Sequence, residues 1–242
     1  MSEYNQIEFG NVTFLICSEL PNDKDQNYYE SFFDRAEILK DQNVELRGGR
    51  GQTLLYIKDN MNLVLRHYKR GGVIGKVLSD KFFFFEPNSH RAADEFKLLQ
   101  YMLSQNLPVP QPVIVREERG IIHIRQDIVI KRLTGYQDLS YILKERALTK
   151  NEFYSIGKTI KLFFDVGILH TDLNIRNILM NEEGKICIID FDKCFKRTMT
   201  KDLRKNVIDR LKRSFIKEKA NKKIPAENFH ETSFKTLEKA SL

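Results

Sequence analysis

The segment from residue 153 to residue 192 constrains the fold more than any other part of the sequence. Its apolar residues first recur at the three- and four-residue spacing of an amphipathic helix: Phe153, Ile156, Ile160 and Phe163. A polar stretch, 170–177, comes next. Two apolar β-prone runs, 178–180 and 186–189, then flank a turn. The chain must therefore fold so that a helix and a β-hairpin hold a polar loop between them.

The rest of the sequence divides into a β-rich first half and a helical second half. Strands are predicted at 12–17, 54–57, 63–67, 121–124 and 128–130. The one main helix of this half carries Ala92, Phe96, Leu99 and Leu103 at helical spacing. It must end at Leu107-Pro108-Val109-Pro110, because proline cannot continue a helix. Further helices are predicted at 138–144, 153–163 and 201–220.

This order of elements predicts an α+β fold of two lobes. The β-rich lobe is expected over 1–134 and the mainly helical lobe over 135–242, with a hinge around 133–136. Two lobes of different composition leave a cleft between them, which is a common place for a ligand.

The polar loop carries a pattern of side chains suited to phosphoryl transfer. Residues 170–177 have the form H-x-D-x-x-x-x-N, and Asp190-Phe191-Asp192 follows 13 residues after Asn177. We expect Asp172 to orient an attacking hydroxyl and accept its proton. The oxygens of Asn177 and Asp190 are ligands that Mg²⁺ prefers, and His170 is expected to brace the loop. A polar turn next to a helix cap would explain the loop alone, but not its joint spacing with Asp190.

Composition and charge narrow the partners and the compartment. The net charge of +7 over 242 residues favours a partner with phosphate or carboxylate groups, or an anionic membrane surface, although a basic protein can simply be soluble. Three cysteines without metal-binding spacing fit a reducing compartment. No signal peptide and no bilayer-spanning apolar run is evident, so we expect a cytoplasmic protein that lies on a membrane at most.

Several motifs resemble known kinases. The H-x-D-x-x-x-x-N and D-F-D motifs are similar to those of the protein-kinase-like superfamily, and D-F-D with L-P-V-P resembles its aminoglycoside and choline kinase branch. A closer resemblance, to the 3-deoxy-D-manno-octulosonic acid (Kdo) kinase family, rests on four blocks: 65–72, 170–174, 189–194 and 210–215. It implies a two-lobed protein-kinase-like fold, with a nucleotide-binding lobe over 1–134 and a catalytic lobe over 135–242. It also implies ATP- and Mg²⁺-dependent phosphorylation of Kdo on a lipid A precursor, at the 4-hydroxyl, on the cytoplasmic face of the bacterial inner membrane.

The kinase resemblance also assigns nucleotide-binding residues to the first lobe. Gly48, Gly49 and Gly51 are expected to let backbone N–H groups approach the phosphates, although glycines near a hairpin often form only a turn. Arg66 stands where kinases carry a phosphate-clamping lysine, and the nearby Lys69 is the alternative. Glu95, on the inward face of its helix, is the expected ion-pair partner of Arg66.

Three further segments bear on the acceptor and the membrane. The cationic loop 66–76 fits an anionic acceptor, the run Phe82–Phe85 fits either the core or lipid, and the basic segment 201–220 fits anionic head groups or a solvated helix face. A soluble cationic acceptor, as in the aminoglycoside and choline kinases, would want an acidic pocket instead. No nucleic-acid-binding motif is present, and neither a nucleic acid nor a protein partner is predicted.

Overall fold

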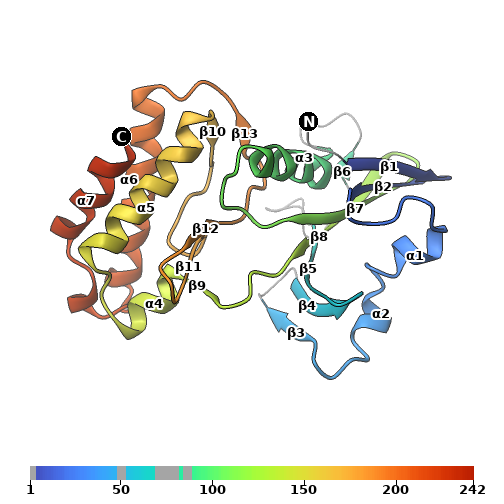
Figure 1. Cartoon of the computed structure of the whole chain (residues 1–242), viewed down its shortest axis with the longest axis horizontal. Coiled ribbons are helices and arrows are strands. Elements are labelled where there is room, and N and C mark those ends of the chain that lie inside the picture. The colour runs from blue at the N-terminus through green and yellow to red at the C-terminus, as the bar shows by residue number, and fades with distance from the viewer. Residues whose placement is uncertain (1–3, 48–52, 69–81, 84–88) are drawn as a thin grey trace. The chain divides into compact units, whose positions relative to one another are not determined.

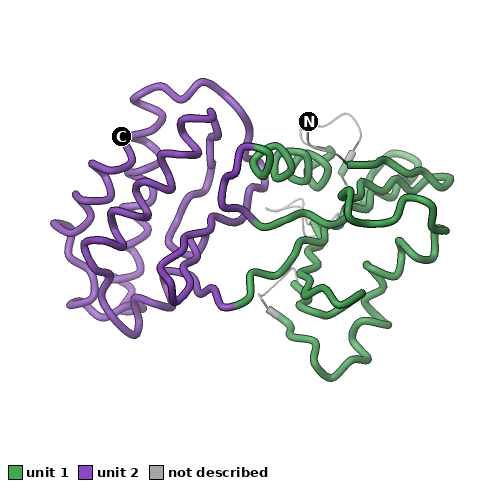
Figure 2. Tube along the Cα trace, viewed as in Figure 1, with its two compact units in different colours: residues 1–104, 110–134 green, residues 105–109, 135–242 purple. Residues whose placement is uncertain are grey.

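The computed structural model describes residues 4–47, 53–68, 82–83 and 89–242. The chain forms two compact units, shown in Figure 2. The first contains residues 1–104 and 110–134, and the second contains 105–109 and 135–242. The chain thus passes into the second unit within the predicted hinge, while the proline-containing segment after the first long helix belongs to the second unit.

The first unit is built on an antiparallel sheet, whose main path runs β1-β2-β7-β8-β5-β4-β3, with β6 paired to β8. Its strands are β1 (Tyr4–Phe9), β2 (Val12–Cys17), β3 (Glu45–Arg47), β4 (Thr53–Lys58), β5 (Met61–His67), β6 (Phe82–Phe83), β7 (Pro112–Arg119) and β8 (His123–Lys131). The turn between β4 and β5 has positive φ at Asp59 (49°) and Asn60 (58°). These angles match the tight turn that twists with the strands, and Asp and Asn tolerate them.

Helices cover this sheet. The short α1 (Gln26–Glu30) and α2 (Arg35–Ile38) accompany a core rich in aromatic residues, which includes Phe14, Tyr29 and Phe32. The long α3 (Arg91–Ser104) packs on β7 and β8, as Figure 1 shows. Since side chains alternate along a strand, Leu65 of β5 enters the aromatic core while its neighbour Arg66 points to the face under α3.

One predicted strand of this unit begins two residues too early, and three strands were not predicted. Residues 121–124 were predicted as a strand. His123 and Ile124 do begin β8, but Ile121 and Ile122 form the turn between β7 and β8, and Ile121 is 95% exposed. The Gly120 N–H donates to the His123 carbonyl and closes this turn. Two β-branched residues give a strong local strand signal, which the pairing of the flanking strands overrides. The strands β1, β3 and β7 were not predicted.

The second unit combines helices with short strands. Its helices are α4 (Leu139–Glu145), α5 (Lys150–Asp165), α6 (Lys201–Ala220) and α7 (Glu231–Ser241), with a 3₁₀ turn, η2 (Ala226–Asn228). Its strands are β9 (Tyr136–Asp138), β10 (Ile168–Leu169), β11 (Ile178–Asn181), β12 (Ile186–Ile188) and β13 (Phe195–Lys196). They form a three-stranded sheet, β12-β11-β9, and the pair β10-β13. A capping box between Thr149 and Glu152 starts α5, the helix that precedes the polar loop.

The long helices of the second unit pack through aromatic residues and one glycine. The ring centroid of Phe215 on α6 lies 6.1 Å from that of Phe153. It lies closer to the rings of Phe229 (4.8 Å) and Phe234 (5.6 Å). A Cβ on Gly157 of α5 would lie 2.4 Å from the backbone oxygen of Leu237, so glycine permits the close approach of α7. Among the residues that the structure describes, no helix is both long and apolar enough to span a bilayer.

Candidate active site

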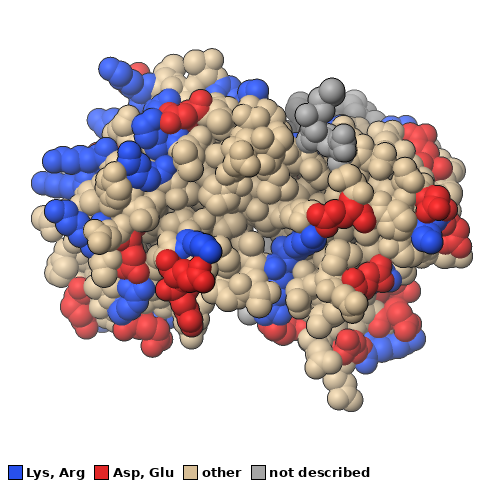
Figure 3. Space-filling model, viewed as in Figure 1, with Lys and Arg blue, Asp and Glu red and all other residues tan. Residues whose placement is uncertain are grey.

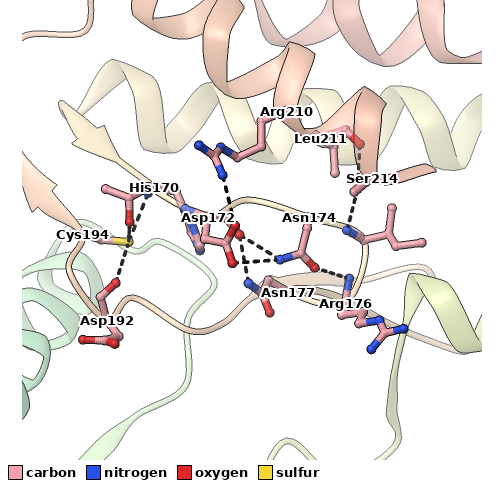
Figure 4. A network of polar contacts seen from close by, with 12 residues as sticks. His170, Asp172, Asn174, Arg176, Asn177, Asp192, Cys194, Arg210, Leu211 and Ser214 are labelled. Atoms are coloured by element: carbon pink, nitrogen blue, oxygen red, sulfur yellow. Dashed lines mark hydrogen bonds and ion pairs between the residues drawn. The ribbon is translucent and has the colours of Figure 1, made fainter. Parts of the chain in front are cut away.

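Two short sheets hold the polar loop at its ends. The loop leaves β10, which pairs with β13, and enters β11, which pairs with β12. The Ile189 N–H donates to the Asn177 carbonyl at 3.0 Å, so the end of the loop is tied to the residue before Asp190. The Thr171 N–H also lies 3.4 Å from Cys194 Sγ. The 170–177 loop and the 190–194 segment therefore form one hydrogen-bonded unit (Figure 4).

His170 braces the 170–177 loop and the 190–194 segment from inside. Its ring is buried, with Nδ1 accepting a hydrogen bond from the Asp172 N–H at 3.2 Å. The proton must then sit on Nε2, which donates to the Ile189 carbonyl at 3.1 Å. Burial lowers the pKa of His170 below its ordinary 6.5, so the ring is neutral at pH 7. These contacts agree with the bracing role predicted from the sequence and leave the ring no role as a base.

Asp172 combines a fixed backbone with an exposed carboxylate. Its carbonyl accepts hydrogen bonds from the side-chain amides of Asn174 (2.9 Å) and Asn177 (3.0 Å). Its side chain is 66% exposed and lies 3.3 Å from Nη1 of Arg210. The carboxylate is therefore presented to solvent from a rigid loop, which is what an incoming hydroxyl group requires.

Asn177 and Asp190 offer hard oxygens from the same hydrogen-bonded unit. The buried Asn177 commits its amide nitrogen to the Asp172 carbonyl, which turns its amide oxygen the other way. Asp190 follows β12 and has a φ of +67°, a left-handed conformation that is unusual for a residue with a side chain. Within the described ranges, no three His, Cys, Asp or Glu side chains cluster as a metal site. The amide oxygen of Asn177 and the carboxylate of Asp190 are hard oxygen donors of the kind that Mg²⁺ prefers, and Mg²⁺ commonly takes one or two protein ligands beside phosphates and water.

The helix α6 contributes a second layer that the sequence did not predict as part of the site. Its Ser214 Oγ accepts a hydrogen bond from the Ile175 N–H at 3.1 Å. Arg176 Nη2 of the loop donates to both carboxylate oxygens of Glu218 at 3.1 Å. In the sequence, the block 210–215 contributed only to the family resemblance. No local pattern links it to the loop some 35 residues earlier. The i, i+4, i+8 spacing of Arg210, Ser214 and Glu218 was the available signal.

The first unit contains the expected ion pair. Nη2 of Arg66 on β5 donates to Oε1 of Glu95 on α3, whose side chain is only 2% exposed. The Tyr68 hydroxyl donates to the other carboxylate oxygen. The solvated alternative for Glu95 is therefore wrong. Gly48, Gly49, Gly51 and Lys69 lie outside the described residues, as do Phe84 and Phe85, while Phe82 is buried.

The predicted site residues thus fall into two sets. Asp172, Asn177 and Asp190 lie together in the second unit, and Arg66 and Glu95 lie together in the first. An antiparallel sheet with one long helix, followed by a helical unit with this loop, defines a two-lobed protein-kinase-like fold. Such an enzyme is a phosphotransferase with a hydroxyl group as acceptor.

The chain belongs to the lipopolysaccharide kinase (Kdo/WaaP) family, whose model matches residues 35–234. Similar curated proteins include a 3-deoxy-D-manno-octulosonic acid kinase of Vibrio parahaemolyticus, 37% identical over 192 residues that cover 79% of each chain. Proteins of the same name from Mannheimia succiniciproducens and Haemophilus influenzae are each 34% identical. They cover 88% and 81% of this chain and 90% and 89% of their own lengths. The predicted family and fold class are confirmed.

Proposed function

We propose that this chain transfers the γ-phosphoryl group of ATP to the Kdo sugar of a Kdo-lipid A precursor, at its 4-hydroxyl, in the assembly of the lipopolysaccharide inner core. The observation that carries the proposal is the exposed Asp172 carboxylate on a loop whose backbone is fixed by His170 and Asn177. The names of the similar proteins support the choice of Kdo as the acceptor.

In this proposal, the second unit supplies the chemistry. Asp172 orients the Kdo hydroxyl and takes its proton late in the transfer, when the hydroxyl oxygen has begun to bond to phosphorus. The Asn177 amide oxygen and the Asp190 carboxylate would hold Mg²⁺, which neutralises charge on the nucleotide phosphates. The locked amide of Asn177 supports this role, because a ligand oxygen that is already oriented needs no rearrangement on binding.

The first unit would hold the nucleotide. Arg66, fixed by the buried Glu95, is proposed to contact the phosphates, since guanidinium binds phosphate oxygens in pairs. Gly48, Gly49 and Gly51 remain proposed backbone contacts for the phosphates. A lysine is not needed at the position of Arg66 if Glu95 keeps the guanidinium in place.

A cationic surface on the second unit supports contact with the anionic cytoplasmic face of the inner membrane. Lys and Arg side chains gather over α5, α6 and α7 at the left of Figure 3. Exposed lysines on α6 and α7 are Lys201, Lys205, Lys217, Lys235 and Lys239. Each contributes about 1 kcal/mol near an anionic lipid surface. Other cations of α6 are neutralised within the unit, as Arg204 is by Asp165 and Lys212 by Glu231.

The alternative is a kinase for a soluble cationic acceptor, as in the aminoglycoside and choline kinases. Such an acceptor would have to approach Asp172 past the guanidinium of Arg210, which lies 3.3 Å from the carboxylate. A cationic acceptor and this guanidinium would repel each other, so Arg210 favours an anionic acceptor.

The deciding experiment offers labelled ATP and Mg²⁺ with Kdo-lipid A precursor, choline, an aminoglycoside and a generic protein as competing acceptors. Label is expected on the Kdo-bearing lipid alone, and transfer only to protein or to a soluble amine would reject the proposal. Asp172→Ala should lower kcat by a factor of about 100 or more while nucleotide affinity survives. Asp190→Ala should instead weaken Mg²⁺-dependent nucleotide binding. Near-normal turnover by the Asp172 variant would show that the base is misassigned.

A further inference from the structure

The helix α6 is attached to the catalytic loop at two points. Ser214 binds the backbone of Ile175, and the Glu218 carboxylate binds the guanidinium of Arg176. The two α6 residues are one helical turn apart, and Arg210 lies one further turn toward the start of the helix. The two attachments therefore fix the place of Arg210 beside Asp172, as Figure 4 shows.

The ion pair between Arg210 and Asp172 is exposed to solvent and weak. It is a single N–O approach of 3.3 Å, between side chains that are 49% and 66% exposed. Exposed pairs of this kind are weak, because water solvates both partners. A guanidinium has five N–H donors, and Asp172 is the only acceptor that contacts Arg210 among the residues the structure describes. Arg210 can therefore bind a second anion while it stays next to the base.

We propose that Arg210 is a binding residue for the carboxylate of the acceptor sugar. This inference rests on the proposed function and adds a subsite to it. A hydroxyl bound to Asp172 and an anion bound to Arg210 lie within about 9 Å of each other, if both use hydrogen bonds of normal length. A distance of this size reaches a group on the same sugar ring or on the ring directly joined to it. The anion is thus carried by the reacting sugar or its direct neighbour, and Kdo offers a carboxylate there.

The charges around Asp172 explain why such a residue is needed. An acidic sugar brings its carboxylate toward a site that already contains the exposed carboxylate of Asp172. Without a cation beside Asp172, these two carboxylates would repel each other. Arg210 removes this repulsion for acidic sugars and gives neutral sugars no comparable contact. It therefore acts as a specificity determinant for a carboxylated acceptor.

The test crosses one substitution with one change in the acceptor. Arg210→Gln and Arg213→Gln are compared with the parent enzyme on Kdo-lipid A precursor, on the same lipid with the Kdo carboxylate converted to an amide, and on the Kdo-bearing lipid with its lipid A phosphates removed. Arg213→Gln is a matched control, because Arg213 is exposed on the same helix and its substitution removes the same charge.

Arg210→Gln should lower kcat/KM on the carboxylated acceptor by about 10- to 100-fold, chiefly through KM, and leave the KM for ATP unchanged. On the amide acceptor the same substitution should cost less than about threefold, and Arg213→Gln should do little on either. An equal loss on both acceptors overturns the inference. So does a loss that disappears only on the dephosphorylated lipid, because the anion would then be a lipid phosphate. Arg210→Lys keeps the charge, so its kcat/KM on the carboxylated acceptor should lie between those of the parent enzyme and Arg210→Gln. This variant tests the inference if Arg210→Gln folds poorly. Absence of transfer by the parent enzyme would reject the proposed function itself.

Discussion

Replacing Glu95 by alanine removes the buried carboxylate that accepts hydrogen bonds from Arg66 and Tyr68. Each hydrogen bond to a charged group contributes about 1.5–3 kcal/mol. The Arg66 side chain is 23% exposed, so water recovers part of the solvation that the ion pair replaces. We therefore expect a net loss of about 2–4 kcal/mol in the free energy of unfolding, somewhat below the cost of breaking a fully buried pair.

The chain has no tryptophan, so unfolding in urea is best followed by far-UV circular dichroism. Glu95→Gln keeps the volume and is the matched control for the lost charge. A double-mutant cycle with Arg66→Met isolates the pair, and a coupling of about 1 kcal/mol or more is expected. A loss below about 0.5 kcal/mol in Glu95→Ala would refute the reasoning, because the substitution leaves the largely buried guanidinium of Arg66 without its partner, and removing one partner of a buried pair is strongly destabilising. Nucleotide affinity measured on the same variants tests the separate role proposed for Arg66, which requires weaker ATP binding in Glu95→Ala.

Two further predictions concern the second unit. The buried His170 has a lowered pKa, so its stabilising effect is fully present above about pH 6.5 and is lost as pH falls below that value, because the unfolded chain then binds a proton that the folded chain does not. His170→Gln should flatten the fall of the urea midpoint between pH 7 and pH 5, and an unchanged slope would contradict this account. Gly157→Ala should destabilise the protein by about 1–3 kcal/mol despite the better helix propensity of alanine, because its Cβ would lie 2.4 Å from Leu237 O. Lys158→Ala, at an exposed position of the same helix, is the control, and a rise in melting temperature in Gly157→Ala would show that α7 moves freely.

The sequence predicted features that depend on neighbours along the chain. The helix α6 was expected at 201–220 and is found at Lys201–Ala220, because proline-free helical periodicity is a local property. The loop 170–177 was recognised because its polar side chains follow one another in a single segment. The pairing of Arg66 with Glu95 was expected because a carboxylate between Ala92 and Leu99 faces inward and requires a cation.

Other features depend on contacts between distant segments, which only the tertiary structure decides. Ile121 and Ile122 have the local signal of a strand, but the register of β7 against β8 places them in a turn. The close approach of α7 to Gly157 likewise becomes visible only when α5 and α7 pack together. Sequence alone therefore determined the loop that carries the proposed base. The position of Arg210 beside that base depends on how α6 packs against the loop, because 38 residues separate the two side chains along the chain.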